Sequence, residues 1–434
     1  MLTIGEKIKQ IRKAKGFSQE NLAHDIGLST STICRIEQGL TPINHEIIKA
    51  IKKALVIESA PLLSGEGEGY RERLYIWHKL ILEGHLIEAR TLQEKLVAIT
   101  SLPYEIDLTT LYRLFEICLL LAEKNYLDAD KGLKNIATCL DEMVIENKYH
   151  YYCSMGWLYM SIGQDRAKEP LEYLCKAYDL QQKPDGDLYY RIARCYTRLG
   201  QPYRSINMLE KAYKAYGNNK TTKISLDLDN KMALNCIDIG DTVRARKILE
   251  KCLENAKNIS NDRYIFVILH NIGSSYARDK HWETALAFFM EASEYIDVED
   301  YNYFVNRYYK ARCLIALKRF AQCKELLAHE PMDSKQVGDS DYLTIMYKSL
   351  NHLMSLREKS SYDYIENITM PYLIKVCNIT EALDYSEIME AFYESKNSTR
   401  KALKFAKIQR DIYKRMVETG HVESCDTDSK LKPV

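Results

Sequence analysis

A recurring pattern of small and large residues constrains this chain most. The segments GDLYYRIARCYTRLGQPYRSINMLEKAY (186–213), LDLDNKMALNCIDIGDTVRARKILEKCL (226–253) and FVILHNIGSSYARDKHWETALAFFMEAS (266–293) align without gaps at a period of 40 residues. Each segment predicts two helices, because apolar residues recur at helical spacing on either side of a turn. The aligned core positions are Ala193, Ala233 and Gly273 in the first helix, then Ser205, Ala245 and Ala285, Leu209, Leu249 and Phe289, and Ala212, Cys252 and Ala292 in the second.

The same frame extends in both directions along the chain. It is the tetratricopeptide pattern, lengthened beyond its usual period of about 34 residues by longer loops. Small residues let antiparallel helices nest, so such pairs stack into a right-handed superhelix with a concave binding surface. Roughly eight or nine helix pairs are predicted. Matching positions are Trp77, Gly84, Ala89 and Leu96; Ile117, Leu120, Ala129, Leu133 and Ile136; Pro170, Leu174 and Ala177; Ala311, Leu314, Cys323 and Leu327; and, in a degenerate last copy, Tyr393, Ala402 and Ala406.

The N-terminal residues follow a different pattern. Within SQENLAHDIGLSTSTICRIEQG (18–39), Ser18 and Ser29 are each placed to cap a short helix, and Gly27 separates the two helices. Two short helices joined by a turn with glycine predict a helix-turn-helix, whose second helix lies in the major groove of DNA. The alternative is a small helical domain with a solvated polar face.

The predicted second helix presents polar side chains that can read bases. Arg35 can bond guanine through two hydrogen bonds, and hydroxyl groups such as those of Thr30 and Ser31 can bond either partner of a base pair. Gln19 and the nearby helix N-termini are placed to bond phosphate oxygens. The predicted DNA contacts are Gln19, Ser29, Thr30, Ser31, Cys34 and Arg35.

Charge confines nucleic-acid binding to one part of the chain. The whole chain has a net charge of +1, whereas residues 1–63 hold nine Lys or Arg and six Asp or Glu.

No run of 18 apolar residues and no signal-peptide core is present, so a cytoplasmic protein without membrane contact is expected. The 12 cysteines are scattered singly, which favours buried free thiols over a metal site or disulfides, and no cofactor is expected.

These observations divide the chain. Residues 1–63 are predicted to form the DNA-binding domain, 64–69 a flexible acidic linker, 70–416 the repeat domain and 417–434 a polar, disordered tail. The GEGEG stretch follows no predicted strand, so a nucleotide-binding loop is disfavoured. Because no catalytic motif occurs, an enzyme is not expected.

The inner face of the predicted superhelix is polar and of mixed charge. It suits an extended peptide, whose backbone requires both hydrogen-bond donors and acceptors; the alternative is a channel of solvated side chains. The candidate peptide contacts are Tyr190, Arg194, Arg198, Asp227, Asn230, His270, Arg278, Tyr308 and Arg312, and Asp187, Asp238 and Ser274 share the same inward positions.

Residues 4–55 resemble the lambda-repressor and Cro class of helix-turn-helix domains. The resemblance rests on Ser18-Gln19, Leu22-Ala23, Gly27, Ile33, Ile36-Glu37 and Gly39. It implies an ion pair between an arginine of the first helix and a glutamate near the end of the reading helix, here Arg12 and Glu37. Cys34 departs from the polar residue common in that class.

A lambda-repressor-like head followed by a tetratricopeptide-like α-solenoid, all-α throughout, resembles the RRNPP family of quorum-sensing receptors of Gram-positive bacteria. The resemblance implies a homodimeric transcription regulator of double-stranded DNA that is controlled by a short signalling peptide in its groove. The alternative is a regulator whose repeat domain sequesters a protein partner while the head only tethers it to DNA. The peptide, the operator and the direction of control are left open by the sequence.

Overall fold

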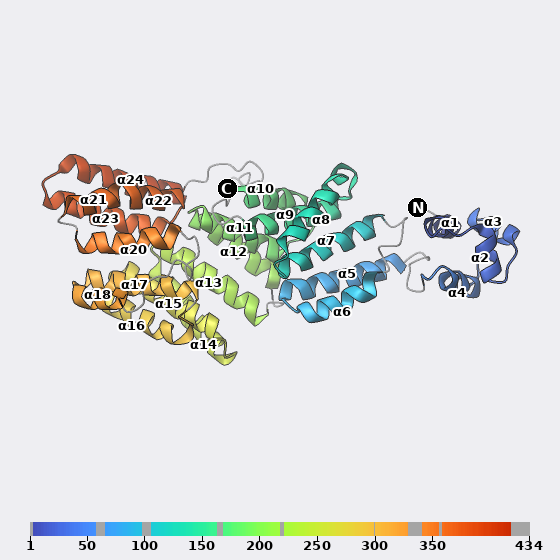
Figure 1. Cartoon of the computed structure of the whole chain (residues 1–434), viewed down its shortest axis with the longest axis horizontal. Helices are drawn as coiled ribbons and strands as arrows, with labels where there is room; N and C mark the ends of the chain where they lie inside the picture. Colours follow the sequence, from blue (N-terminus) through green and yellow to red (C-terminus); the bar gives the residue numbers. More distant parts are fainter. Residues whose placement is uncertain are drawn as a thin grey trace, which may run out of the picture. The chain divides into compact units, whose positions relative to one another are not determined.

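The computed structural model describes residues 3–57, 66–97, 106–162, 168–217, 221–298, 300–328, 341–355 and 358–417. In these ranges every regular element is a helix, as the all-α prediction requires (Figure 1). The chain divides into two compact units, residues 1–182 and 183–434, and each is described by itself. Of the predicted tail, residues 418–434 lie outside the described residues.

The head consists of four short helices. Their bounds are α1 (Ile4–Ala14), α2 (Gln19–Asp25), α3 (Thr30–Glu37) and α4 (His45–Ala54). The hydroxyl of Ser18 accepts a hydrogen bond from the amide of Asn21, and that of Ser29 accepts one from the amide of Thr32, so both predicted caps are confirmed. The core is aliphatic, with Ile8, Ile11, Leu22, Ile33, Ile36, Ile51 and Leu55 fully buried.

Helices α1 and α3 approach at backbone contact. A Cβ atom at Gly5 would overlap the carbonyl oxygen of Ile36, so only glycine fits at this position of α1. The chain therefore brings the reading helix closer to α1 than side-chain packing alone would allow.

A buried ion pair joins the helices of the head. The Arg12 guanidinium donates from Nε to Oε1 of Glu37 at 2.5 Å and from Nη2 to Oε2 at 3.0 Å, as the resemblance implied. Nη1 of Arg12 donates to the carbonyl oxygen of Phe17, and Nε2 of Gln19 donates to Oε2 of Glu37 at 2.8 Å. These bonds fix the end of α3 against the end of α1 and the start of α2.

Unit 1 continues with three helix pairs. They are α5 (Glu66–Glu83) with α6 (Leu86–Leu96), α7 (Ile106–Ala122) with α8 (Tyr126–Ala137), and α9 (Ile145–Ile162) with α10 (Lys168–Leu180), and a short 3₁₀ turn, η2 (Leu140–Glu142), follows α8.

The start of α5 corrects the predicted linker. Residues 66–69 belong to this helix, while 64 and 65 lie outside the described residues. Two glycines in a helix cost about 1 kcal/mol each, but burial of Tyr70, Leu74 and Trp77 farther along α5 stabilises the helix.

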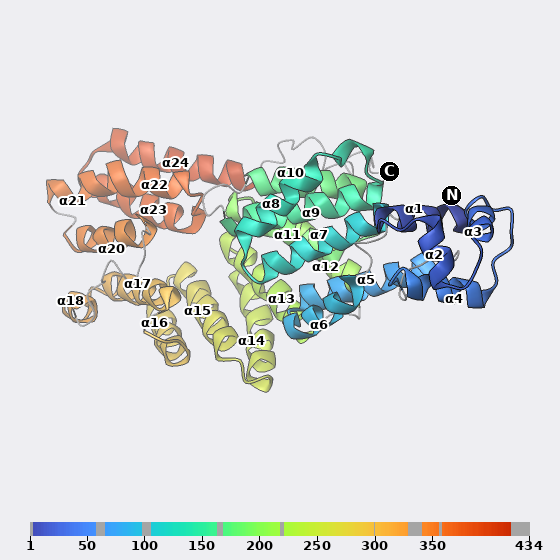
Figure 2. The same ribbon diagram turned by 45° about the vertical axis from the view of Figure 1, so that its right-hand side comes forward.

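The described residues of unit 2 form six further pairs of helices, which can be followed by their labels in Figures 1 and 2. The bounds of the first four are α11 (Gly186–Arg198) with α12 (Pro202–Tyr216), α13 (Thr222–Asp238) with α14 (Thr242–Asn258), α15 (Asp262–Arg278) with α16 (Trp282–Ala292), which the 3₁₀ turn η4 (Ser293–Tyr295) follows, and α17 (Tyr301–Ala316) with α18 (Phe320–Ala328). The last two are α20 (Asp341–Met354) with the continuous α21 (Lys359–Tyr364), π-helical η5 (Ile365–Thr369) and α22 (Met370–Lys375), and α23 (Ile379–Ser395) with α24 (Thr399–Val417).

The predicted small positions are the contact points of the pairs. Ala193, Ala233, Ser205, Ala245 and Ala285 are fully buried. At Gly273 a Cβ atom would lie 2.9 Å from the ring of Phe289, the residue that replaces the leucine of the two preceding repeats. The missing methyl group thus makes room for the larger ring, and the repeat frame read from the sequence is confirmed.

The Arg12–Glu37 pair gives a prediction for the head. Replacing Glu37 by Ala leaves the Arg12 guanidinium buried without its carboxylate, so the head should lose about 3–5 kcal/mol of stability. In Arg12→Met/Glu37→Leu no unpaired charge is buried, and most of this loss should disappear. Hydrogen exchange of peptides from residues 3–57, followed by mass spectrometry, measures the stability of the head in the native chain and in the two variants. If Glu37→Ala and the native chain were equally protected, the account would be contradicted.

Candidate functional site

The predicted reading face of the head lies on α3. Thr30, Ser31 and Arg35 are exposed there and Cys34 is half-buried. Cys34 and Arg35 follow Thr30 and Ser31 by one helical turn, so the four predicted side chains lie on the same side of α3 and share one surface. The hydroxyl of Ser29 caps the helix and bonds the hydroxyl of Ser31 at 2.8 Å, which orients Ser31 at the helix N-terminus.

Two of the predicted contacts have partners inside the head. Gln19 is half-buried and uses one amide donor on Glu37, so only its remaining hydrogen-bonding capacity is open to a phosphate. The sulfur of Cys34 accepts a hydrogen bond from Nε2 of Gln38 at 3.4 Å. The exposed carboxamide of Gln38, which sequence reasoning did not select, thus extends the polar surface by one turn.

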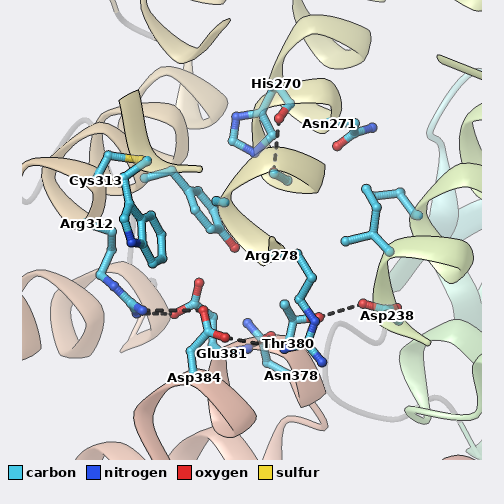
Figure 3. Close-up of a pocket in the computed structure, with 16 residues that line it drawn as sticks. Asp238, His270, Asn271, Arg278, Arg312, Cys313, Asn378, Thr380, Glu381 and Asp384 are labelled. Carbon is cyan, nitrogen blue, oxygen red and sulfur yellow. Dashed lines mark hydrogen bonds and ion pairs between the residues drawn. The ribbon is translucent and has the colours of Figure 1, made fainter. Parts of the chain in front are cut away.

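In unit 2, a cavity of about 210 Å³ gathers several of the predicted inward residues (Figure 3). His270 and Arg278 come from α15, Arg312 from α17 and Asp238 from α13. The opposite wall is formed by α23 with Asn378, Thr380, Glu381 and Asp384, and the remaining lining residues are Leu234, Ile237, Asn271, Ser274, Ala277, Trp282, Tyr309 and Cys313.

Helix α23 is bonded to three of the inner helices. Nη1 of Arg312 lies 2.7 Å from Oε2 of Glu381, a buried ion pair, and Nη2 lies 3.4 Å from Oδ2 of Asp384. Arg278 pairs with the other oxygen of Asp384 at 3.4 Å, and the hydroxyl of Thr380 donates to Oδ1 of Asp238 at 2.6 Å. The pocket is thus closed by polar contacts between segments up to 142 residues apart.

The hydrogen bonds around His270 define what it offers to a ligand. Nδ2 of Asn306 donates to the carbonyl of Phe289 and to the hydroxyl of Ser293, so its Oδ1 is the atom that accepts from Nδ1 of His270 at 2.8 Å. Burial lowers the pKa of His270 to about 4 although this hydrogen bond raises it. The ring is therefore neutral at pH 7, and its Nε2 is a hydrogen-bond acceptor.

Asn271 adds a carboxamide to the same wall. It donates from Nδ2 to Oδ1 of Asn230 at 2.6 Å, which joins α15 to α13. Its Oδ1 stays available to accept a hydrogen bond, and the Arg278 guanidinium adds donors to the lining of the same pocket. The pocket therefore presents both donors and acceptors, as an extended peptide backbone requires.

Two carboxyl groups of the pocket resist ionisation. Burial raises the pKa of Asp238 to about 6, although the Thr380 hydrogen bond lowers it. Burial likewise raises the pKa of Asp384 to about 6, against the opposite effect of Arg312. Both carboxylates are charged at pH 7 at a cost in free energy of folding.

The remaining predicted contacts do not line this pocket. Tyr190, Arg194 and Arg198 lie on α11, and Asp227 on α13 accepts a hydrogen bond from Tyr264 at 2.8 Å. Asn230 reaches the pocket only through Asn271.

Tyr308, a predicted ligand contact, does not line the pocket in this structure. Its side chain is 1% exposed, and its hydroxyl donates to Glu381 at 2.8 Å. The equivalent positions on the earlier helices are half-buried, whereas here α23 covers the inner face of α17. Tyr308 supports the carboxylate that pairs with Arg312.

The α23 side chains were missed by sequence reasoning. Glu381, Asp384 and Glu387 recur every three residues, which marks one acidic face of a helix. The partners of these residues are distant in the sequence, so the acidic face alone did not reveal a site.

The comparisons with known proteins follow this division of the molecule. Residues 8–57 match the protein family described as Helix-turn-helix. The chain is 21% identical over 416 residues to the transcriptional activator NprA of Geobacillus stearothermophilus, across 90% of this chain and 98% of that protein.

Solved structures share the helical fold. The quorum sensor NprR of B. thuringiensis, in its apo form, has a TM-score of 0.62 at 18% identity, covering 80% of this chain and 99% of its own. NprR in complex with its cognate peptide NprX has a TM-score of 0.61 at 19% identity, with coverages of 81% and 99%. A Rap protein complexed with Competence and Sporulation Factor has a TM-score of 0.66 at 14% identity, covering 80% of this chain and 99% of its own. These structures share the helical-repeat fold of this chain, as the resemblance to the RRNPP family implied.

Two further properties concern the described residues alone. None of their helices combines the length and the apolar character needed to cross a membrane. The same residues contain no cluster of three or more His, Cys, Asp or Glu side chains able to hold a metal ion.

The raised pKa of Asp238 gives a pH-dependent prediction. In Asp238→Asn the buried group stays neutral and still accepts from Thr380, so at pH 8 the variant should be more stable than the native chain by about 1–3 kcal/mol. The native carboxyl takes up a proton as the pH falls through about 6 towards its unfolded value of about 4. The difference should therefore vanish over that range. Urea unfolding of both proteins at several pH values measures it, and a difference independent of pH would contradict the assignment.

Proposed function

We propose that the chain is a cytoplasmic, sequence-specific transcription regulator whose repeat domain binds a short signalling peptide that controls DNA binding. The observation that carries the proposal is the combination of an exposed reading face on α3 with a donor- and acceptor-lined pocket in the repeats. In this proposal residues 1–63 bind DNA, and residues 70–416 bind peptide and form a homodimer.

The head supports DNA binding through its geometry. Ser31 and Thr30 stand at the N-terminus of α3, and Arg35 follows one turn later on the same exposed face. Arginine and hydroxyl side chains at these places can reach base edges when the helix enters the major groove. A dimer would hold two heads over half-sites about 34 Å apart or a multiple of that distance.

The pocket supports peptide binding through its chemistry. Asn271 and His270 offer a carboxamide and an imidazole group to a backbone, while Trp282 and Leu234 provide apolar surface for a side chain. NprR is described in complex with its cognate peptide NprX, and this chain shares that fold at 19% identity. We infer that the occupant here is also a short linear peptide.

The contacts of α23 provide the coupling. Because this helix is bonded to α13, α15 and α17, a peptide that competes for Asp384 or Arg278 alters how the repeats are held together. A ligand shifts such an equilibrium only by its difference in affinity for the two arrangements.

DNA reading is tested by capture of genomic fragments from the source organism on the purified full-length chain. The native protein should enrich a few paired half-sites, and Thr30→Ala/Ser31→Ala/Arg35→Ala should lose them, because each good base contact contributes about 1–3 kcal/mol of discrimination. The matched control is Arg263→Ala, whose side chain is 75% exposed on α15. Enrichment that survives in the triple variant would contradict the assignment of α3.

Peptide binding is tested by selection from a library of linear peptides of about five to ten residues. Selected peptides should bind Asn271→Ala at least about tenfold more weakly, the effect of losing about 1.4 kcal/mol. Asn207→Ala on α12, where the side chain is exposed, is the control and should bind normally. Recovery of a stoichiometric protein, with no peptide selected, would favour the alternative of a protein partner.

A further inference from the structure

The last helix of the described chain carries an unusual concentration of positive charge. Helix α24, TRKALKFAKIQRDIYKRMV, has seven basic residues and one acidic residue, a net charge of +6. The whole protein has a net charge of only +1. The excess of cations in this helix is therefore balanced elsewhere in the chain and not along the helix itself.

Three of the seven cations of α24 have partners elsewhere in unit 2, and one of these, Arg415, donates from Nη2 to the sulfur of Cys377 at 2.9 Å. Lys401 and Lys404 both pair with Glu366, at 3.4 and 2.7 Å, and serve packing within unit 2. Arg400, Lys407 and Lys414 are exposed, and in the described part of the chain no carboxylate lies within 4.0 Å of them. Arg410 contacts only its exposed neighbour Asp411, at 3.1 Å.

The exposed cations that have no partner outside α24 among the described residues form one stripe, which Asp411 shares because it follows Lys407 by four residues. Arg400, Lys407 and Lys414 are seven residues apart, which places them on one side of the helix at intervals of about 10 Å. Arg410 lies on the same side, three residues after Lys407 and four before Lys414. The stripe covers about 21 Å of helix length, comparable to several phosphate steps of a DNA strand.

The apolar face of α24 is already occupied. Ala402, Phe405, Ile412 and Met416 are buried in the core of unit 2. A helix that lies in a membrane surface buries its apolar face in lipid, and here that face is not available. The terminal helix of a repeat array requires a polar outer face, but polarity alone does not require an excess of four cations over the one carboxylate of Asp411.

We propose that the outer face of α24, formed by Arg400, Lys407, Arg410 and Lys414, binds the phosphate backbone of double-stranded DNA without regard to base sequence. The basis is charge complementarity between a row of exposed cations and a regular polyanion. This contact is additional to the base reading of α3. It would increase the time the protein spends on DNA and would contribute salt-dependent affinity.

The test measures binding of the full-length protein to a fluorescent DNA duplex of random sequence by anisotropy, at salt concentrations between about 50 and about 200 mM. The α24 variant is Lys407→Glu/Arg410→Glu/Lys414→Glu. Its affinity should fall at least tenfold, and the slope of log affinity against log salt should become shallower by about 3, one for each lost phosphate contact.

The matched control is Lys247→Glu/Lys251→Glu/Lys257→Glu on α14, where the same charge change is made at exposed lysines that alternate with Glu250 and Glu254. It should bind within about twofold of the native chain, since those lysines form no uniform cationic face. Lys407→Gln/Arg410→Gln/Lys414→Gln removes the positive charges of these residues without reversing them. It should lose less DNA affinity than the Glu variant and show the same shallower slope of log affinity against log salt. Circular dichroism checks the fold of each variant.

Three results would overturn the proposal. One is an α24 variant that binds the duplex as tightly as the native chain, and another is an equal loss in the α14 control, which would assign the effect to net charge. The third is unchanged DNA binding together with lost binding to vesicles containing phosphatidylserine, which would assign the stripe to an anionic lipid surface.

Discussion

Close packing of a small residue against a large one across each helix pair is the constraint on which the repeat domain depends. Ala193, Ala233 and Gly273 are positions where the first helix meets the second without a bulky side chain between them. Because this contact recurs at a fixed interval, each pair presents the same face to its neighbour. The inner face that carries the pocket is a consequence of this nesting, since it is the side of the first helices that the second helices leave uncovered.

Polar contacts then give the stacked helices their specific arrangement. Arg312, Glu381 and Asp384 form a buried network that is costly to assemble and more costly to break, because removal of one partner leaves a desolvated charge. In the head, Arg12 and Glu37 act in the same way on a smaller scale. Such networks favour one arrangement of helices over others, and a ligand that supplies alternative partners can change which arrangement is preferred.

Local and periodic signals were sufficient to predict most of the fold. The caps at Ser18 and Ser29 and the 40-residue frame depend on residues near one another or on a fixed repeat, and both are confirmed. The predicted linker extended into α5 because the glycines at the start of this helix indicated a flexible segment, although apolar residues at helical spacing follow them. The α23 wall of the pocket could not be predicted, because its partners are 69 to 142 residues away and no periodicity connects them. For the same reason Tyr308 was assigned to an open groove that α23 in fact covers.

The central claim is that peptide in the pocket and DNA on the head are energetically coupled. The most direct test is the affinity of the full-length protein for a captured genomic fragment, with and without a saturating selected peptide, in the native chain and in Asn271→Ala. We expect the peptide to change the native affinity at least about fivefold, in either direction, and to leave the variant nearly unaffected at the same peptide concentration. A peptide that saturates the native protein while the DNA affinity stays constant would contradict the account.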